Sequence, residues 1–259
     1  MDRQSIYSWD WSAEDYGRHR AGFPARAFER FASHGIGLPG QAIVDLGTGT
    51  GTLARGFAAR GARVVGVDVA QDSLRVAEDL ASREGVSVRW VEAPAETTGL
   101  DAGFDVVSAG QCWHWFDRPR AAAEARRLLR PGGRLLIAHF DFLAAPEVRT
   151  AARVLRDELG ALEYDPETYA GLKPAWLRDC ATAGFVHLET FSFDVAVPYT
   201  RDGWRGRLRA SNWLARLSME RRREVDRALE EAFRAHEGTF EIPHRVFAVM
   251  AVAPDRRMA

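Results

Sequence analysis

The chain has 259 residues, of which 46% are hydrophobic and 27% are charged, and its formal net charge at pH 7 is −1. This is enough chain for one α/β domain, and the balanced charge argues against general affinity for nucleic acids or anionic membranes, which would need a basic excess. No apolar run reaches the ~20 residues of a membrane helix, the N-terminus is polar, and Cys112 and Cys180 are too few for a disulfide framework. We therefore expect a cytoplasmic protein, and a monomer or a homodimer is the expected oligomeric state.

Residues 1–40 are expected to form a helical segment ahead of the first strand. Phe28 and Phe31 lie three residues apart, a spacing that places both on one helix face. Tyr16 and Arg20 precede them, and by the residues alone this part reads as a surface helix with a solvated arginine.

A strand, a glycine turn and a helix are expected over residues 42–59. The apolar pair at positions 43 and 44 predicts a strand buried on both faces, and Gly47, Gly49 and Gly51 follow it before a helical pattern. Glycine lets the backbone turn sharply and lets a ligand lie against the main chain, while the helix N-terminus offers unpaired N–H groups. The stretch therefore predicts a cradle for a nucleotide-type ligand.

The glycine spacing separates the ligands that such a cradle could hold. A dinucleotide fingerprint, G-x-G-x-x-G, would need a glycine where Thr52 or Ala54 stands, and the phosphate loop G-x-x-x-x-G-K-[ST] is absent because Lys173 is the only lysine. The remaining pattern is D-x-G-x-G-x-G with Asp45 at its start. It resembles motif I of the class I S-adenosylmethionine-dependent methyltransferases.

This resemblance implies S-adenosyl-L-methionine as the cofactor and S-adenosyl-L-homocysteine as its product. In that family the three glycines, here with Thr48 between them, pass under the methionine part of the cofactor, and the early acid, here Asp45, lies near its amino group. Tyr16 and Arg20 are similar to the family's lead-in segment, where the tyrosine and the arginine close over the cofactor. Arginine suits that place because its planar guanidinium pairs bidentately with a carboxylate.

A second buried strand is expected over residues 63–68, and Asp68 ends it. An acid at this place, about 20 residues past the glycine turn, can accept hydrogen bonds from the ribose hydroxyls of an adenosine ligand. A capping or loop aspartate is the alternative. Val69 would then flank the adenine.

A third strand is expected over residues 86–91, followed by a loop that contains Ala95 and Glu96. In the family that the chain resembles, an acid in this loop often accepts the adenine amino group, and Ala95-Glu96 is the matching position. An exposed loop glutamate is the alternative.

A fourth strand over residues 104–109 leads into Gly110-Gln-Cys-Trp-His-Trp-Phe-Asp117. Because ligands bind outside the carboxyl ends of parallel strands, we expect this segment to face the site, with Gln111 toward the cofactor. Aromatic rings here can pack a planar or apolar substrate. The rings assigned to the substrate are those of Trp113, Trp115 and Phe116. Their sequence resembles motif IV of the trans-aconitate and related small-acid methyltransferases.

Methyl transfer from a sulfonium is a direct displacement, so the enzyme mainly aligns donor and acceptor and excludes water. A general base is needed only when the acceptor must lose a proton, as a phenol or a hydroxyl does. His114, among the aromatic residues, is the first candidate base, and His139, at the end of the fifth strand, is the second. Each could instead be a packed, hydrogen-bonded histidine, and no cluster of acids indicates a metal.

The rest of the pattern completes the fold class. Leu129-Arg-Pro-Gly-Gly133, a turn before a buried strand, is a further mark of the same family. The later elements expected are a helix over 118–129, a strand over 134–139, helices over 144–162 and 173–183, and strands over 185–193 and 242–252. We predict an α/β fold, Rossmann-like, with a seven-stranded mostly parallel sheet, an antiparallel C-terminal hairpin and helices on both faces.

The expected parts of this single domain, residues 1–259, are a cap at 1–40, a cofactor-binding core at 41–140 and helical lid insertions at 141–172 and 198–240. Asp141, Trp204 and Arg207 are assigned to the substrate. The alternative is that the arginines of the second insertion form a solvated face.

The predicted function is transfer of a methyl group to a small-molecule acceptor, aromatic or carboxylic, with oxygen favoured as the acceptor atom. One alternative is an NAD-linked oxidoreductase, which the glycine spacing and the lack of a Tyr-x-x-x-Lys pair disfavour. The other is a methyltransferase-like binding protein without catalysis.

Overall fold

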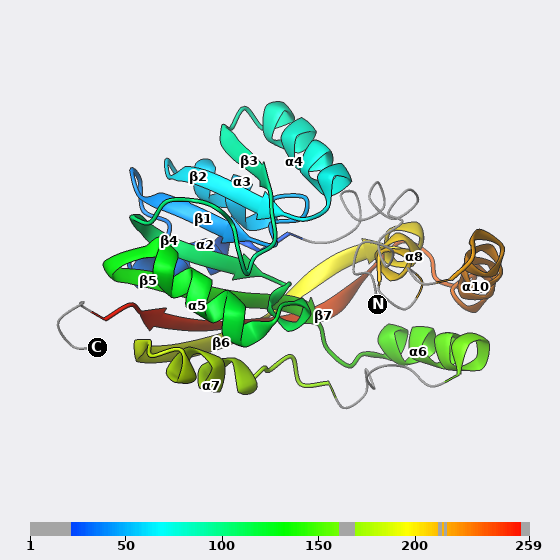
Figure 1. Ribbon diagram of the computed structural model, residues 1–259. Coiled ribbons are helices and arrows are strands. Elements are labelled where there is room, and N and C mark those ends of the chain that lie inside the picture. Colours follow the sequence, from blue (N-terminus) through cyan, green and yellow to red (C-terminus); the bar gives the residue numbers. More distant parts are fainter. Residues whose placement is uncertain (1–21, 161–168, 212–213, 215–216, 255–259) are drawn as a thin grey trace. The chain divides into compact units, whose positions relative to one another are not determined.

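The computed structural model describes residues 22–160, 169–211, 214 and 217–254 (Figure 1). The chain divides into two compact units. The first unit contains residues 22–140, 173–193 and 246–254, and the second contains the described parts of 141–172 and 194–245. Tyr16 and Arg20 lie outside the described residues. The expected division into cap, core and lid stays a prediction.

One seven-stranded sheet organises the described residues, with the strand order β3-β2-β1-β4-β5-β7-β6. Its strands are β1 (Ala42–Leu46), β2 (Arg63–Asp68), β3 (Val88–Glu92), β4 (Phe104–Gly110), β5 (Leu129–Phe142), β6 (Val186–Thr200) and β7 (Thr239–Val252). The pairs β1–β2, β2–β3, β1–β4 and β4–β5 are parallel. The C-terminal strands form an antiparallel pair, so the predicted fold class is confirmed.

Helices connect the strands. They are α2 (Ala25–Ser33), α3 (Thr52–Ala58), α4 (Gln71–Arg83), the short η2 (Trp113–Trp115), α5 (Arg118–Leu128), α6 (Pro146–Leu159), α7 (Ala175–Thr182), α8 (Arg201–Arg209) and α10 (Met219–Ala232). Asp117 caps α5 and Ser218 caps α10, because each side chain accepts a hydrogen bond from a backbone N–H of the first turn. Over the described ranges, no helix has the length and apolarity that crossing a membrane requires.

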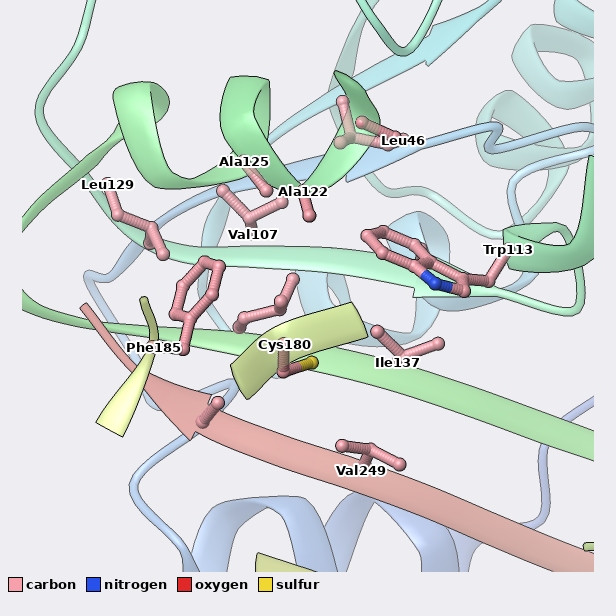
Figure 2. Packing of buried hydrophobic residues seen from close by; sticks show 14 of the residues in the cluster. Leu46, Val107, Trp113, Ala122, Ala125, Leu129, Ile137, Cys180, Phe185 and Val249 are labelled. Atoms are coloured by element: carbon pink, nitrogen blue, oxygen red, sulfur yellow. The ribbon is translucent and has the colours of Figure 1, made fainter. Parts of the chain in front are cut away.

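The main core of the first unit lies between one face of the sheet and the helices α5 and α7 (Figure 2). Val44 and Leu46 of β1 point into it because alternate residues of a strand face the same side. Helix α5 presents Ala121, Ala122 and Ala125 to this face, and their small side chains allow the helix to pack close to the sheet. This packing holds the carboxyl ends of β1 and β4 in fixed places.

An aromatic cluster packs α2 against α3 and β6 in the same unit. The rings of Phe28 and Phe57 meet edge to face with centroids 5.4 Å apart, and Phe31 lies 5.9 Å from Phe191. Phe28 and Phe31 are both buried, so the expected helix face is confirmed. The guanidinium of Arg30 lies over the Phe191 ring at 5.0 Å, a cation–π contact at the edge of the cluster.

The turn expected at residues 130–133 is wrong in one respect, because these residues lie inside β5. The register of β4 against β5 shifts from Phe104↔Leu129 to Val106↔Arg134, so the four residues 130–133 of β5 stand opposite the single residue Asp105 of β4. Gly132 has φ +71°, and its N–H donates to the carbonyl of Ala253 at 3.0 Å. The strand continues through the glycines because their backbone bonds to Ala253, the residue after β7, instead of β4.

The second unit has its own apolar core. Helix α10 contributes Val225 and Leu229, and its C-cap residue contributes Phe233, and all three side chains are fully buried. Arg205 and Arg209 both bond the carboxylate of Asp226, so these two arginines connect α8 to α10. The two guanidinium groups are therefore ion-paired with a carboxylate and are not simply solvated.

Candidate functional site

The glycine turn after β1 uses each of its glycines for a different reason. All three have positive φ, +62° at Gly47, +55° at Gly49 and +79° at Gly51. A Cβ at Gly47 would lie 2.7 Å from the Phe116 ring, and one at Gly51 would lie 2.7 Å from the Trp90 ring. Among the described residues, none lies within 4 Å of a Cβ built at Gly49. The outer glycines therefore let neighbouring rings approach the turn, whereas the middle one leaves space beside the main chain.

Asp68 is joined to this turn. Its Oδ2 accepts a hydrogen bond from the N–H of Gly49 at 2.7 Å, and its Oδ1 accepts one from the N–H of Ala70 at 2.9 Å. Burial raises the pKa of Asp68, and these backbone hydrogen bonds lower it in part. Val69 beside it is 49% exposed, so an apolar surface adjoins the carboxylate. The carboxylate thus fixes the turn and keeps lone pairs for a further donor.

Asp45 holds the turn from inside the fold. Its two carboxylate oxygens accept hydrogen bonds of 2.7 Å each, from the hydroxyls of Thr48 and Ser108. The side chain is 1% exposed, and burial raises its pKa to about 6 despite these bonds. Asp45 therefore ties β1 to the turn and to β4, and its predicted contact with the cofactor's amino group stays a prediction.

The loop with Ala95 and Glu96 is anchored at two points. Glu96 Oε1 accepts the backbone N–H of Asp117 at 2.8 Å, so this glutamate connects the loop after β3 to the segment after β4. Two residues on, the backbone N–H and the hydroxyl of Thr98 both donate to Oε1 of Glu124, at 3.0 and 2.6 Å. Ala95 is buried. Glu96 is therefore a partnered residue at the carboxyl edge of the sheet, and its adenine contact stays a prediction.

The segment 111–117 docks onto the glycine turn. The Cys112 thiol donates to the carbonyl of Leu46 at 3.1 Å, and Cys112 Sγ would lie 2.8 Å from a Cβ at Gly47. Trp113 is 0% exposed, and its indole N–H donates to Asp179 at 3.0 Å. This burial does not fit the assignment of Trp113 to the substrate, because its ring already fills the core between α5 and α7 (Figure 2).

The structure brings the two candidate histidines together. The rings of His114 and His139 meet edge to face with centroids 6.2 Å apart. His114 is exposed and lies 4.8 Å from the Trp115 ring, whereas His139 is buried against Trp176. Phe116 and Trp115 are half-buried, so their rings keep surface for a ligand. Of the two histidines, His114 has the ring that a substrate can reach.

The three substrate residues of the second unit are close neighbours. Arg207 Nη2 donates to Asp141 Oδ1 at 2.7 Å, and its guanidinium lies over the Phe142 ring at 5.1 Å. Arg207 is 4% exposed, so the alternative of a solvated face is wrong for this arginine. Trp204 is 0% exposed and packs its ring against Phe142. Neither ring nor guanidinium has free surface here, and a substrate contact stays a prediction.

Known proteins agree with this geometry. A model of the methyltransferase domain matches residues 44–137, from β1 through most of β5. A demethylmenaquinone methyltransferase of Thermus thermophilus is 34% identical over 179 residues, which cover 62% of this chain and 81% of that protein. The chain belongs to the class I S-adenosylmethionine-dependent methyltransferases.

Two further proteins show how far the likeness extends. An uncharacterised methyltransferase of Mycobacterium bovis is 37% identical to this chain over 122 residues, which are 46% of each chain. The chain thus spans about half the length of that relative. The solved structure of a candidate type II methyltransferase from Anaeromyxobacter dehalogenans is 26% identical with a TM-score of 0.62, and the match covers 91% of this chain and 98% of that one. The fold of the methyltransferases therefore extends over nearly the whole chain.

Sequence reasoning missed two residues that shape the site of this methyltransferase. Trp90 of β3 lies against both Gly51 and Gly66, where a Cβ would come within 2.7 and 2.5 Å of its ring. Ser108 in β4 donates to Asp45. A serine inside an otherwise apolar buried strand was the available signal for the second, because a buried hydroxyl needs a partner.

Proposed function

We propose that this protein transfers a methyl group from S-adenosyl-L-methionine to a small-molecule acceptor and releases S-adenosyl-L-homocysteine. The observation that carries the proposal is the turn around Gly49, open on the side of the missing Cβ and bonded through its N–H to Asp68. It belongs to a chain of the methyltransferase family. Membership of the family indicates the class of cofactor, and the space beside Gly49 is where we propose that the cofactor binds.

The residues fit the parts of the cofactor in a consistent way. The turn with Thr48 and Gly49 would support the methionine part, because the space beside Gly49 admits a ligand against the main chain. Asp68 would accept the ribose hydroxyls with the lone pairs that its two backbone bonds leave. The exposed side chain of Val69 would cover one face of the adenine. Bound in this way, the cofactor supplies an electrophilic methyl group on a sulfonium.

The other cofactor residues of the proposal act around this centre. Asp45, Gly47 and Gly51 shape the turn, Ala95 and Glu96 would meet the adenine edge, and Gln111 would meet the methionine part. Tyr16 and Arg20, outside the described residues, would close over the cofactor, as the family resemblance implies. In each case the contact with the cofactor is part of the proposal.

His114 would act as the general base when the acceptor loses a proton. Its ring is exposed, follows β4 and lies beside Trp115, so an acceptor stacked on that indole has the imidazole within reach. His139 behind it would orient the ring. The half-buried rings of Trp115 and Phe116 favour a planar acceptor, and we favour oxygen as the methylated atom.

Titration calorimetry tests the cofactor. S-adenosyl-L-methionine and S-adenosyl-L-homocysteine are expected to bind saturably at one site per chain, and NAD and NADH are expected to give no saturable heat. Binding of NADH without binding of either sulfur compound would overturn the proposal in favour of an oxidoreductase.

An acceptor panel tests the chemistry. Phenols, carboxylic acids and amines are incubated with the protein and the cofactor, and released S-adenosyl-L-homocysteine is measured. Turnover with a phenol or a carboxylic acid is expected. Tight cofactor binding with no turnover over the whole panel would contradict catalysis on small acceptors and would support a binding protein.

A further inference from the structure

Gln111 has an unusual backbone conformation at the carboxyl end of β4. Its φ is +67°, and among the described residues only one other non-glycine residue, His187, has a positive φ. A non-glycine side chain in the left-handed region is destabilising, because its Cβ crowds the following carbonyl oxygen. Such a residue persists only when its neighbours hold it in place, and strained residues of this kind cluster at functional sites.

The neighbours of Gln111 hold it firmly. Its own N–H donates to the carbonyl of Ala138 at 2.8 Å, which extends the hydrogen bonding between β4 and β5 by one residue. A Cβ at Gly110 before it would come within 2.7 Å of Leu53, so α3 packs directly on that residue. Cys112 after it is bonded to the carbonyl of Leu46. The conformation of Gln111 is therefore imposed by contacts to β1, α3 and β5.

The side chain of Gln111 also destabilises the folded state, for a second reason. Its Oε1 is buried and has no hydrogen-bond partner within the described part of the chain. A buried polar atom without a partner destabilises the folded state. The side chain as a whole is only half-buried, so rotation of the amide can turn this oxygen to the surface without breaking a hydrogen bond of its own. A ligand that brings a donor to this edge would satisfy it.

The acid nearest in sequence to the turn is not available for that donor. Both oxygens of Asp45 are engaged by Thr48 and Ser108, and the side chain is 1% exposed. Gln111 follows the strand that pairs with β1 at Asp45↔Ser108, so it lies at the same edge of the sheet as the glycine turn. Among these groups, the amide of Gln111 is the acceptor without an intramolecular partner.

We propose that Gln111 binds the α-ammonium of the cofactor's methionine part through its amide oxygen, and that Asp45 serves only to hold the turn. This inference rests on the proposed function, because it presupposes that S-adenosylmethionine binds at the turn. It names the chemical group that Gln111 recognises, and it explains why the chain keeps a strained residue with an unsatisfied oxygen at this position.

The test compares two ligands and two variants. The ligands are S-adenosyl-L-homocysteine and its analogue in which hydrogen replaces the α-amino group, and their affinities are measured by calorimetry. Gln111→Leu is expected to weaken S-adenosyl-L-homocysteine about tenfold or more, since hydrogen bonds to charged groups contribute about 1.5–3 kcal/mol. The deaminated analogue is expected to bind the variant and the parent protein equally.

Thermal unfolding without ligand separates this role from a structural one. Gln111→Leu removes an unsatisfied oxygen, so its melting temperature is expected to equal or exceed that of the parent protein. Gln41→Leu is the matched control, because the Gln41 side chain bonds the backbone of Gly35, Gly37 and Leu38. That variant is expected to melt at a lower temperature and to bind both ligands as the parent does.

Each outcome decides one question. Equal loss of affinity for both ligands in Gln111→Leu, or unchanged affinity for both, overturns the assignment of the ammonium to Gln111 while S-adenosyl-L-homocysteine binding still supports the proposed function. Absence of binding by the parent protein overturns both. A lower melting temperature of Gln111→Leu together with equal effects on both ligands would show a purely structural residue.

Discussion

The backbone N–H of Gly49 donates a hydrogen bond of 2.7 Å to Oδ2 of Asp68, which joins the turn after β1 to the end of β2. One carboxylate therefore fixes the turn, and in the proposed function it also accepts the ribose. Because both tasks depend on the same oxygens, ligand binding and the stability of the turn are expected to change together at this position.

Replacement of Asp68 by alanine tests this double role. Asp68→Ala removes two acceptors of backbone hydrogen bonds and the proposed ribose contact, so the affinity for S-adenosyl-L-homocysteine is expected to fall about 10–100-fold. Calorimetry measures it. Asp72→Ala is the control, since Asp72 is exposed on α4, and it is expected to bind as the parent does. An unaltered affinity in Asp68→Ala would remove Asp68 from the ribose site.

The glycine turn is expected to tolerate alanine poorly at Gly47. An added Cβ would lie 2.7 Å from Phe116 and 2.8 Å from Cys112. Gly40→Ala is the matched control, because Gly40 also has a positive φ but open space around it. Gly47→Ala is expected to lower the free energy of unfolding, measured with urea, by about 1–3 kcal/mol more than Gly40→Ala. Equal losses would mean that the segment 111–117 moves aside freely.

Asp45 is expected to make stability depend on pH. Its pKa in the folded protein is raised to about 6, so the folded state binds the proton more tightly than the unfolded chain does. Ionisation of Asp45 lowers the free energy of unfolding, and this loss is complete above pH 6. The free energy of unfolding rises again as the pH falls toward 4. Urea unfolding of Asp45→Asn should lack this pH dependence. Between pH 7 and pH 4, the free energy of unfolding of the parent protein is expected to rise by at most about 3 kcal/mol more than that of the variant. Parallel pH profiles of the two proteins would contradict it.

Glu124 is expected to stabilise the protein in the opposite pH range. Hydrogen bonds from Arg127, and further ones from Thr98, hold its pKa at about 2 against the effect of burial. Its contribution is present above about pH 4.5 and is lost as the pH falls through 2. Glu124→Gln is expected to lose about 2 kcal/mol of unfolding free energy at pH 7, and less at pH 3, with exposed Glu78→Gln as the control. A loss independent of pH would point to packing alone.

Replacement of His114 tests the proposed base. His114→Ala is expected to reduce kcat about 10²–10⁴-fold with a phenol or hydroxyl acceptor, because such an acceptor must lose a proton, and to leave a carboxylate acceptor nearly unaffected. The affinity for S-adenosyl-L-homocysteine should stay that of the parent protein. His34→Ala, at the C-cap of α2, is the control. Full turnover of His114→Ala with phenols would mean that positioning alone suffices.

The sheet could be predicted from local pattern because its strands are short apolar runs separated by turn residues. The C-terminal half of β6 shows where prediction from local pattern fails. Alternation predicts a strand over residues 185–193, yet β6 runs to Thr200. Its second half contains Pro198, which by local preference ends a strand. The bulge at 130–133 is similar, since a Pro-Gly-Gly sequence predicts a turn by local preference, whereas in the fold its hydrogen bonds go to Ala253, just after β7.

The site could be predicted where a motif has fixed spacing, as at the three glycines and Asp68. Side-chain exposure was not predictable, because it depends on which elements pack together. Trp113 and Trp115 are two residues apart and chemically alike, but Trp113 fills the core and Trp115 keeps surface. The pairing of Arg207 with Asp141 spans 66 residues and has no local signal.

The ring of Trp90 restricts the order in which substitutions can be accepted at Gly51 and Gly66. It occupies the places that a Cβ at Gly51 or Gly66 would need, and Gly66 has no positive φ of its own. At Gly66 the obstacle is therefore steric alone, and its larger part disappears once a smaller residue stands at position 90, which leaves Thr48 Cγ2 at 3.0 Å. Divergence at these two positions is expected to be epistatic: loss of the tryptophan permits alanine at 66, whereas alanine first disrupts the strand beneath the turn.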